Sequence, residues 1–174
     1  MNLIELAACV SDHLRKNDID NVLTGGSCAV IYSKDRYMSM DLDFVDLNYS
    51  SEKKIADAME KIGFKKKGIG YRHPDTEIIV EILSAPLSIG EEKIEKINEV
   101  ILNKRILKML TPTDCVKDRL AAFYFWNDRQ SLEVSLMVAE ENKIDLKEIK
   151  RWSISEGMED KFNQFKNKLK NISK

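Results

Sequence analysis

The hydrophobic pattern of the first residues predicts a helix, a strand and a second helix in turn. Apolar side chains recur at helical spacing through residues 3–16, so they would share one face of a helix. Residues 20–24 then have the pattern of a short strand that runs directly into Gly25. After the glycine turn, residues 27–32 have the pattern of the first turns of a helix, and we expect Ser27 to be its N-cap.

The pattern between residue 37 and Pro86 adds strands that belong to one small sheet. The expected elements, in chain order, are a strand at 37–47, a helix at 51–62 that Ser50 or Ser51 would cap, and strands at 64–67 and 77–83. Turn-forming residues at 68–75 would join the last two strands. Because helices and strands follow one another in this irregular order, the sequence predicts an α+β fold, with a small mixed β-sheet flanked by helices.

The pattern becomes helical in the last third of the chain. Residues 94–101 predict either a short helix or an irregular linker, and residues 105–110 a last strand. Thr111 and Pro112 then form a strong helix start, with the threonine as N-cap and the proline at the first helical position. Helices are expected at 112–126, 128–142, 145–156 and 158–170. The chain therefore divides into an α/β core, residues 1–110, and a C-terminal helical region, residues 111–174, packed on that core.

Composition narrows the class of protein. The 29 acidic and 28 basic residues nearly cancel, so net charge predicts neither a nucleic-acid nor a membrane partner. No apolar run approaches the ~20 residues that span a bilayer, and the N-terminus lacks a signal-peptide pattern, so we expect a cytoplasmic protein. Cys9, Cys28 and Cys115 match no zinc spacing and are expected to be reduced thiols. His13 and His73 are too few for a histidine-based metal site.

The segment Leu23-Thr-Gly-Gly-Ser27 has the chemistry of an anion-binding turn. Gly25 and Gly26 allow the backbone to approach a ligand closely, and the helix that follows would point unpaired N–H groups at an anion. Ser27 adds a hydroxyl group for a phosphate oxygen. By itself the segment is also typical of a tight strand-to-helix turn that needs glycine for a positive φ.

Three carboxylates form a candidate metal site. Asp41 and Asp43 are two apart on a predicted strand, so both leave the same face, about 7 Å apart, as oxygen ligands suited to a divalent ion. The alternative is a solvated edge strand with two exposed acids. Glu81 interrupts an apolar run, where an unpaired charge is costly, so either a metal ion or a salt bridge to lysine would offset it. Glu77 shares its face and is the lesser candidate. The glycine turn and the acids together predict a phosphate-and-metal site.

Four basic residues lie where they could reach a bound triphosphate: Arg36, Lys117, Arg119 and Arg129. Each also reads as an ordinary surface charge paired with a nearby acid. The run Phe123–Trp126 is too continuous to be one helical stripe, so most of its rings would be core and one could stack on a base. The lysines toward the C-terminus, Lys174 included, favour a solvated helix end over an RNA contact.

These motifs resemble a known group of enzymes. Gly26-Ser27 followed by Asp41-Leu-Asp-Phe44 looks like the signature of the nucleotidyltransferase superfamily, which has the polymerase-beta-like fold. The Leu-Thr-Gly-Gly-Ser opening is similar to the prokaryotic branch that includes the abortive-infection toxin nucleotidyltransferases, which belong to toxin–antitoxin systems. Residues 81–90 and 111–120 resemble a small uncharacterised prokaryotic branch nearby, and the resemblance extends to about Ala139.

The resemblance implies a chemistry for the candidate residues. Asp41, Asp43 and Glu81 would be the catalytic acids that bind two Mg²⁺ or Mn²⁺ ions. Gly26 and Ser27 would hold the nucleoside triphosphate, ATP among the possibilities, and we add Gly25 and Lys117 as expected nucleotide-binding residues. The reaction would transfer a nucleoside monophosphate to an acceptor hydroxyl of an RNA end such as tRNA, a protein or a small molecule.

The sequence also departs from the superfamily pattern. Gly25 stands where a larger apolar residue often precedes the Gly-Ser pair, and the third carboxylate is Glu81 where aspartate is commoner. These departures leave a second hypothesis open. The chain could be a non-catalytic binding module of the same fold, acting as an antitoxin, a regulator or a partner subunit.

Overall fold

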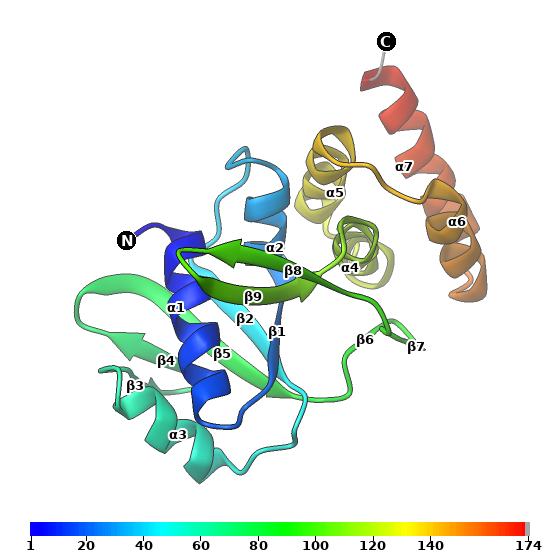
Figure 1. Ribbon diagram of the computed structural model, residues 1–174. Coiled ribbons are helices and arrows are strands. Elements are labelled where there is room, and N and C mark those ends of the chain that lie inside the picture. The colour runs from blue at the N-terminus through cyan, green and yellow to red at the C-terminus, as the bar shows by residue number, and fades with distance from the viewer. Residues whose placement is uncertain (173–174) are drawn as a thin grey trace.

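A computed structural model describes residues 1–172, and seven strands of that part form one mixed sheet in the order β3-β4-β5-β2-β1-β9-β8 (Figure 1). The strands are β1 (Asn21–Thr24), β2 (Asp41–Asp46), β3 (Lys65–Lys67), β4 (Gly70–His73), β5 (Thr76–Ser84), β8 (Ile97–Leu102) and β9 (Arg105–Leu110). A separate hairpin consists of β6 (Ser88–Ile89) and β7 (Glu92–Lys93). Residues 173–174, the end of the expected helical region, lie outside the described residues.

The centre of the sheet is made by β1, β2 and β5. Strand β1 runs antiparallel to β2 and parallel to β9, and β2 runs parallel to β5. Leu42 and Phe44 of β2 are fully buried and alternate with Asp41 and Asp43, as expected for a strand with one core face. The predicted mixed sheet is confirmed, and its core face holds the apolar side chains that the hydrophobic pattern marked.

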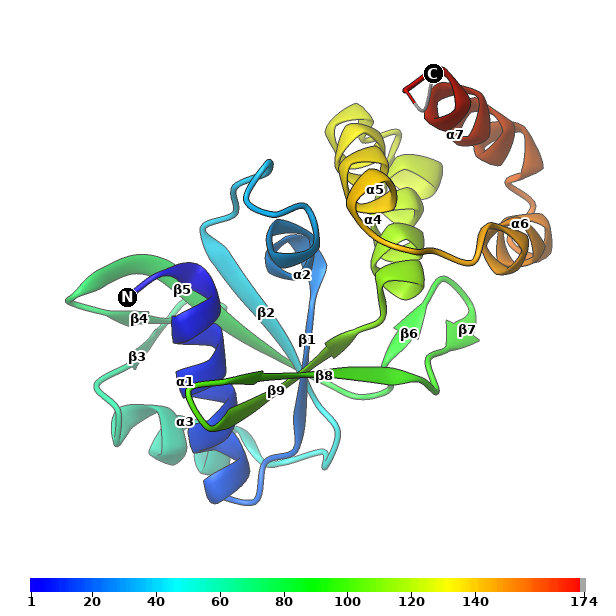
Figure 2. The ribbon, with the colours of Figure 1, turned by 45° about the horizontal axis from the view of Figure 1, so that its top comes forward.

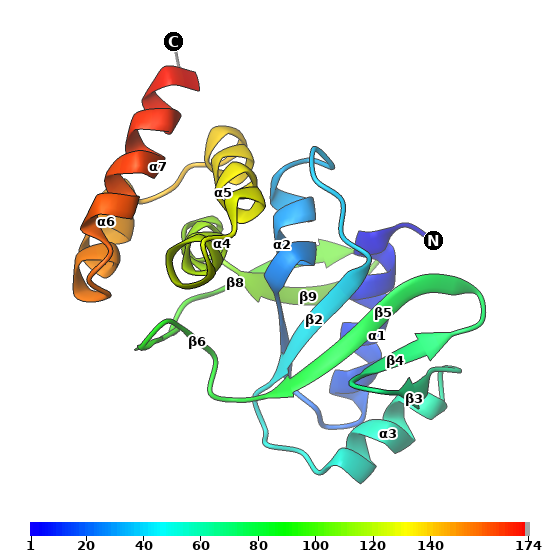
Figure 3. The same ribbon diagram turned by 180° about the vertical axis from the view of Figure 1, so that it is seen from behind.

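Two helices cover the core face of the sheet. They are α1 (Leu3–Lys16), which begins with a capping box between Asn2 and Glu5, and α3 (Glu52–Glu60), which Ser51 caps through the backbone N–H of Lys54. Helix α2 (Gly25–Tyr32) follows β1 directly and contacts β2. In the view from behind, no helix of the described part lies in front of β2 and β5 (Figure 3). The face that carries Asp41 and Asp43 is therefore open.

The C-terminal helices stand beside this open face (Figure 2). They are α4 (Pro112–Trp126), α5 (Arg129–Glu141), α6 (Leu146–Ser155) and α7 (Glu159–Ile172). The predicted helices are confirmed to within two residues at each end. Helix α4 starts directly after β9, with Thr111 as N-cap and Pro112 in its first turn, and contacts α2. The candidate site and the helical region thus meet along α2 and α4.

Two predictions for the connecting segments were wrong. Residues 94–101 are neither a helix nor an irregular linker, because β8 begins at Ile97 and pairs with β9 along its whole length. Asn103 and Lys104 both have positive φ, which gives the two-residue turn that matches the twist of a hairpin. This turn was not predicted because neither of its two residues is a glycine. Residues 68–75 are also more than a turn, since β4 lies within them and pairs with both β3 and β5.

The predicted start of the second helix was wrong by two residues. Helix α2 begins at Gly25, and Thr24 is its N-cap without a side-chain hydrogen bond. Ser27 lies within the first turn, where its hydroxyl donates to the carbonyl oxygen of Thr24 at 3.3 Å. Gly25 adopts φ of +65°, so the chain turns from strand to helix at the glycine itself.

Candidate active site

Three carboxylates meet on the open face of the sheet. Asp41 and Asp43 alternate with the buried residues of β2, and Glu81 of β5 is the direct partner of Asp43 in the parallel pairing. Among residues 1–172 no ion pair includes any of the three, so the structure does not supply the lysine partner considered for Glu81. The fold therefore places the three predicted acids on one face of the sheet, none of them in an ion pair of the described residues.

The pKa of Asp43 is shifted by its burial and by the two neighbouring carboxylates. Burial, and after it the neighbouring carboxylates of Glu81 and Asp41, together raise the pKa of Asp43 from its ordinary value to about 6. The guanidinium group of Arg119 opposes this effect. A cation placed among the three carboxylates would remove the repulsion, because an opposite charge within a few ångströms favours the ionised form.

The glycine turn touches this acidic group. A Cβ atom on Gly25 would lie 2.2 Å from Oδ2 of Asp43, so the carboxylate occupies the space of the missing side chain. Gly26 approaches the loop before β2, where a Cβ atom would lie 3.2 Å from Oγ of Ser39. Thr24 donates its hydroxyl to the carbonyl oxygen of Asp43 at 3.2 Å. The strand-to-helix turn and the metal-ligand candidates are therefore one site.

Gly70, which lies beside Glu81 on the neighbouring strand, is a residue of the site that the sequence analysis did not identify. Gly70 belongs to β4, and a Cβ atom there would lie 2.5 Å from Cγ2 of Ile79 and 3.4 Å from Cγ of Glu81. Its missing side chain leaves room for Ile79, the residue two positions before Glu81 on the same strand face. A glycine in a predicted turn gives no sign of this role, because the role depends on the pairing of β4 with β5.

Ser27 is fully buried, and its hydroxyl contacts the backbone of Thr24. A phosphate contact through this hydroxyl would require it to release Thr24, so the contact predicted from the sequence stays a prediction. The backbone N–H groups at the start of α2 are the more direct anion donors, since the first turn of a helix leaves them without partners within the helix.

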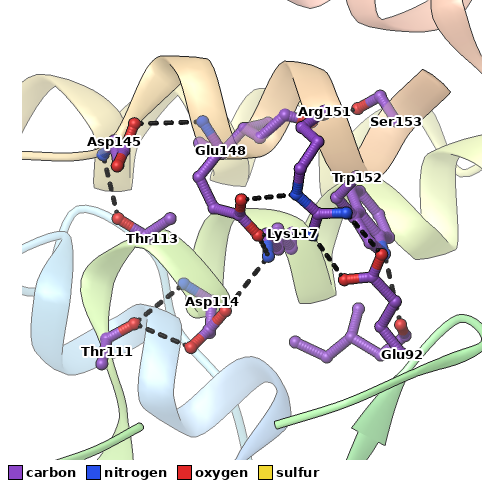
Figure 4. A network of polar contacts seen from close by, with 12 residues as sticks. Glu92, Thr111, Thr113, Asp114, Lys117, Asp145, Glu148, Arg151, Trp152 and Ser153 are labelled. Carbon is purple, nitrogen blue, oxygen red and sulfur yellow. Dashed lines mark hydrogen bonds and ion pairs between the residues drawn. The ribbon is translucent and has the colours of Figure 1, made fainter. Parts of the chain in front are cut away.

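Lys117 lies in a different environment from the acids. It is 4% exposed, and its Nζ donates to Oε1 of Glu148 at 2.7 Å and lies 3.6 Å from Oδ1 of Asp114 (Figure 4). The same nitrogen lies 5.9 Å from the ring centre of Trp152 on α6. The structure does not bring Lys117 together with Asp43, and the nucleotide contact predicted for it stays a prediction.

The Lys117 network lines a cavity of about 570 Å³ between the β6–β7 hairpin, the start of α4 and α6. Arg151 joins the two sides, with hydrogen bonds to both carboxylate oxygens of Glu92 at 2.7 and 2.8 Å and to Glu148 (Figure 4). These contacts, first from Arg151 and then from Lys117, hold the pKa of Glu148 at about 2. The network ties α4 and α6 to the hairpin, and its basic groups already have carboxylate partners.

Arg119 is the basic residue whose charge opposes the raised pKa of Asp43. It lies on α4, where its Nε and Nη2 atoms donate to Oδ2 of Asp118 at 3.0 and 2.6 Å, and it acts on the pKa of Asp43. Its side chain keeps 18% of its surface exposed. The sequence analysis named both as residues that could reach a triphosphate and chose Lys117 as the expected nucleotide contact, whereas the rotation of α4 places Lys117 in the network with Glu148. Arg36 pairs instead with Glu140 in the last turn of α5.

The residues present fit a divalent cation in their chemistry. Three oxygen-bearing side chains without ion-pair partners, one of them with a raised pKa, are the donors that Mg²⁺ and Mn²⁺ prefer. Within residues 1–172, no three His, Cys, Asp or Glu side chains are close enough to hold an ion in the conformation described.

Comparison with known proteins supports the fold. The chain is similar to the crystal structure of an antigenic nucleotidyltransferase-like protein from Paracoccidioides brasiliensis, with a TM-score of 0.58 and 15% sequence identity over 79% of this chain and 75% of that one. No family model matches the chain. No curated protein matches it either. The chain therefore has a nucleotidyltransferase-like fold, as predicted, while its place near the abortive-infection branch stays a prediction.

In the part of the chain that the structure describes, no helix is both long and apolar enough to cross a membrane. All three cysteines are free thiols, although Cys28 and Cys115, distant in sequence, are in hydrogen-bond contact. Burial, followed by this contact, raises the pKa of Cys28 well above its ordinary value, which makes it an inert core thiol.

Proposed function

We propose that this chain is a metal-dependent nucleotidyltransferase that transfers a nucleoside monophosphate from a nucleoside triphosphate to an acceptor hydroxyl. The observation that carries the proposal is the contact of Gly25 with Asp43. It places an anion-binding turn against a carboxylate that two further carboxylates already repel. Such an arrangement is unfavourable on its own and becomes favourable when cations join the acids to a bound phosphate. The nucleotidyltransferase-like fold supports the same class of reaction.

Asp41, Asp43 and Glu81 would hold Mg²⁺ or Mn²⁺. When bound, such ions supply Lewis-acid chemistry that activates an acceptor hydroxyl and neutralises a leaving pyrophosphate. The task of the three carboxylates is to fix the charge and position of the ions on a rigid pair of strands. Because Asp43 and Glu81 are register partners, their separation is set by the sheet and not by a flexible loop.

The glycine turn and Arg119 would hold the triphosphate. Gly25 and Gly26 present backbone without side chains, and the N-terminus of α2 directs N–H groups toward the same face. Arg119 would exchange its bond with Asp118 for phosphate oxygens, which a planar guanidinium group binds in the same two-pronged way. This part of the site binds and orients the nucleotide, and electrostatic stabilisation does the rest.

Label transfer from the α-phosphate tests this function. The purified full chain would be incubated with each α-³²P nucleoside triphosphate, Mg²⁺ or Mn²⁺, and a cell extract that supplies nucleic acids and proteins. We expect a labelled species with the wild-type chain and none with the Asp41→Ala/Asp43→Ala variant. Glu81→Gln should lose most of the activity, whereas Glu77→Gln, an exposed glutamate earlier on the same strand face, should retain it.

A folded wild-type chain that labels nothing with any nucleotide would contradict the enzymatic proposal. Isothermal titration calorimetry of the triphosphate with and without Mn²⁺ then tests the second hypothesis, a non-catalytic binding module. Binding that Mn²⁺ does not strengthen, and that the double aspartate variant retains, would favour the non-catalytic binding module.

A further inference from the structure

One row of residues crosses four neighbouring strands on the open face of the sheet, from β2 through β5 and β4 to β3 (Figure 3). Asp43 of β2 is the register partner of Glu81 of β5. Gly70 of β4 comes next, because a Cβ atom on it would lie 3.4 Å from Cγ of Glu81, and Gly70 is the register partner of Lys67 of β3. Directly paired residues share one face of a sheet, so Lys67 lies on the face of the acids.

Two more basic residues extend Lys67 into a basic strip. Arg72 lies two positions after Gly70 on β4, and residues two apart on a strand share a face. Arg72 is also the register partner of Lys65 on β3. The side chains of Lys65, Lys67 and Arg72 are all exposed. The basic strip therefore shares the open face with the acids, and Lys67 is about 10 Å from Glu81, because two strand spacings separate β3 from β5.

The middle lysine of β3 lies on the opposite face of the sheet. Lys66 is the register partner of Tyr71, which is buried in the core. Its Nζ lies 3.4 Å from Oε1 of Glu52 on α3, one of the helices that cover the core face. Strand β3 therefore divides its lysines between the two faces. The lysine on the core side has a carboxylate partner, which provides a natural control for the two on the open side.

The basic strip has no counter-ion among residues 1–172. No ion pair of these residues includes Lys65, Lys67 or Arg72. The acids in the same row are also without ion pairs, and Gly70 places no side chain between the two groups. Cations at one end of the row and carboxylates at the other thus remain available to a ligand that is anionic at one end and joins metal ions at the other.

The glycine turn lies on the other side of the acids from the basic strip. Strand β1 pairs with β2 on the edge away from β5, and Gly25 contacts Asp43. Three strand spacings, about 14 Å, separate β2 from β3. A triphosphate chain held at the turn is too short to reach the strip as well. An anion at the strip therefore belongs to the second substrate, on the far side of the acids from the nucleotide.

The small extent of the basic strip narrows the class of this second substrate. On the open face of these four strands it has three cations, and Glu77 and Leu83, which flank Glu81 on β5, add no basic charge. A nucleic-acid strand is held by neutralising several successive phosphates, and the formal net charge of −1 offers no wider basic surface. Three neighbouring cations, one of them a guanidinium group, suit a single phosphate group. They would repel a cationic acceptor.

We infer that the basic strip binds the phosphate group of a small phosphorylated alcohol, whose free hydroxyl reaches the acids and accepts the nucleoside monophosphate. The inference rests on the proposed function, because it names the chemical class of the acceptor. The hydroxyl oxygen would bond to the α-phosphorus while the bond from that phosphorus to the bridging oxygen breaks. Pyrophosphate leaves with the bonding electrons, and the hydroxyl proton passes to water. The strip positions the acceptor and takes no part in these bond changes.

NMR of the ¹⁵N-labelled full chain tests the strip without the reaction. Glycerol 3-phosphate and glycerol are the paired probes, added without nucleotide or metal. We expect glycerol 3-phosphate to shift the backbone amide signals of β3 and β4, and glycerol to leave them unchanged. Lys67→Gln and Arg72→Gln should each weaken this binding by about tenfold, since each removes a hydrogen bond between charged groups. Lys66→Gln is the matched control and should bind as the wild type does.

Two results of this titration would overturn the inference. One is the absence of any shift with glycerol 3-phosphate. The other is equal weakening by Lys66→Gln and Lys67→Gln, because the lysines would then act only through net charge. In that case their role would be to protect the edge strand β3 from pairing with another chain.

Label transfer tests the acceptor class directly. A cell extract is separated by size into macromolecules and small molecules, and half of the small-molecule fraction is treated with a phosphatase, which is removed before the α-³²P nucleoside triphosphate and Mg²⁺ or Mn²⁺ are added. We expect label only in the untreated small-molecule fraction. Lys67→Gln should lower the initial rate at limiting acceptor by about tenfold and change the rate at saturating acceptor little. Transfer to RNA, or transfer that survives the phosphatase, would overturn the inference.

The two proposals fail in different ways. Label transfer to a macromolecule that the Asp41→Ala/Asp43→Ala variant abolishes would uphold the enzyme and overturn this acceptor. Phosphate binding that depends on Lys67, without label transfer by the folded chain to any fraction, would contradict the enzyme and with it the acceptor role, and would leave the strip as a phosphate-binding site alone.

Discussion

The carboxylate of Asp43 occupies the space that a side chain on Gly25 would need. The gap from the Oδ2 atom to the ideal Cβ position is 2.2 Å, and Gly25 has φ of +65°. Two independent demands therefore fix glycine at this position, one from the backbone conformation and one from the neighbouring carboxylate. The contact explains a departure from the superfamily pattern, in which a larger apolar residue often precedes the Gly-Ser pair.

Gly25→Ala should destabilise the fold more than a positive φ alone explains. The substitution adds a left-handed backbone penalty of roughly 1 kcal/mol and a clash with Asp43 that costs about 1–3 kcal/mol more. Gly68→Ala is the matched control, because Gly68 has φ of +66° with nothing within 4 Å of its Cβ position. Urea denaturation of both variants measures the difference. Equal losses of stability would show that Asp43 moves aside at no cost.

Asp43→Asn should stabilise the chain at neutral pH. The native pKa of about 6 exceeds the unfolded value, so the stability that protonated Asp43 contributes is present below about pH 4 and is lost as pH rises through 6. Asparagine cannot ionise, so we expect a gain on the order of 2 kcal/mol at pH 8 and almost none at pH 4. Urea denaturation at the two pH values measures it. A pH-independent loss of stability would contradict the account.

Lys117→Met should destabilise the chain while leaving triphosphate binding intact. The ammonium group is buried between Glu148 and Asp114, and its removal leaves Asp114 without its ion-pair partner and Glu148 with Arg151 alone, at a cost of about 2–4 kcal/mol. Lys147→Met, on the exposed side of α6, is the control and should change stability little. Calorimetric titration of the triphosphate completes the comparison. Unchanged stability with weaker nucleotide binding would instead support the role predicted for Lys117 from the sequence.

Lys104→Gly should stabilise the β8–β9 hairpin. Lys104 has φ of +65° in a two-residue turn, where glycine carries no steric penalty, so we expect a gain of roughly 0.5–1 kcal/mol. Lys53→Gly in the exposed part of α3 is the contrast and should lose about 1 kcal/mol. Thermal denaturation distinguishes the two. A loss of stability in Lys104→Gly would mean that its side chain, and not its backbone, matters in the turn.

The sequence predicted those features that depend on residues close together along the chain. The alternation of Asp41 and Asp43 with Leu42 and Phe44 is local, and the strand places the acids on one face as expected. The start of α4 is also local, since Thr111 caps and Pro112 opens the helix within four residues. The strand at residues 97–102 was missed although its partner β9 is adjacent in sequence, because the turn between them, Asn103–Lys104, contains no glycine.

Tertiary structure alone decided which of these residues share a site. Glu81 lies beside Asp43 because β5 pairs with β2 in one register, and a shift of one residue would turn its carboxylate to the core face. Lys117 and Arg119 are about 200° apart around α4. The packing of that helix therefore places Lys117 in a network with Glu148, whereas Arg119 lies where its charge affects the pKa of Asp43. Strand register and helix rotation arise from contacts across the whole chain. The sequence by itself therefore indicated the acidic strand, its glycine turn and Glu81 as candidates, and the fold determined that Glu81 pairs with Asp43 and that Lys117 lies in a separate network.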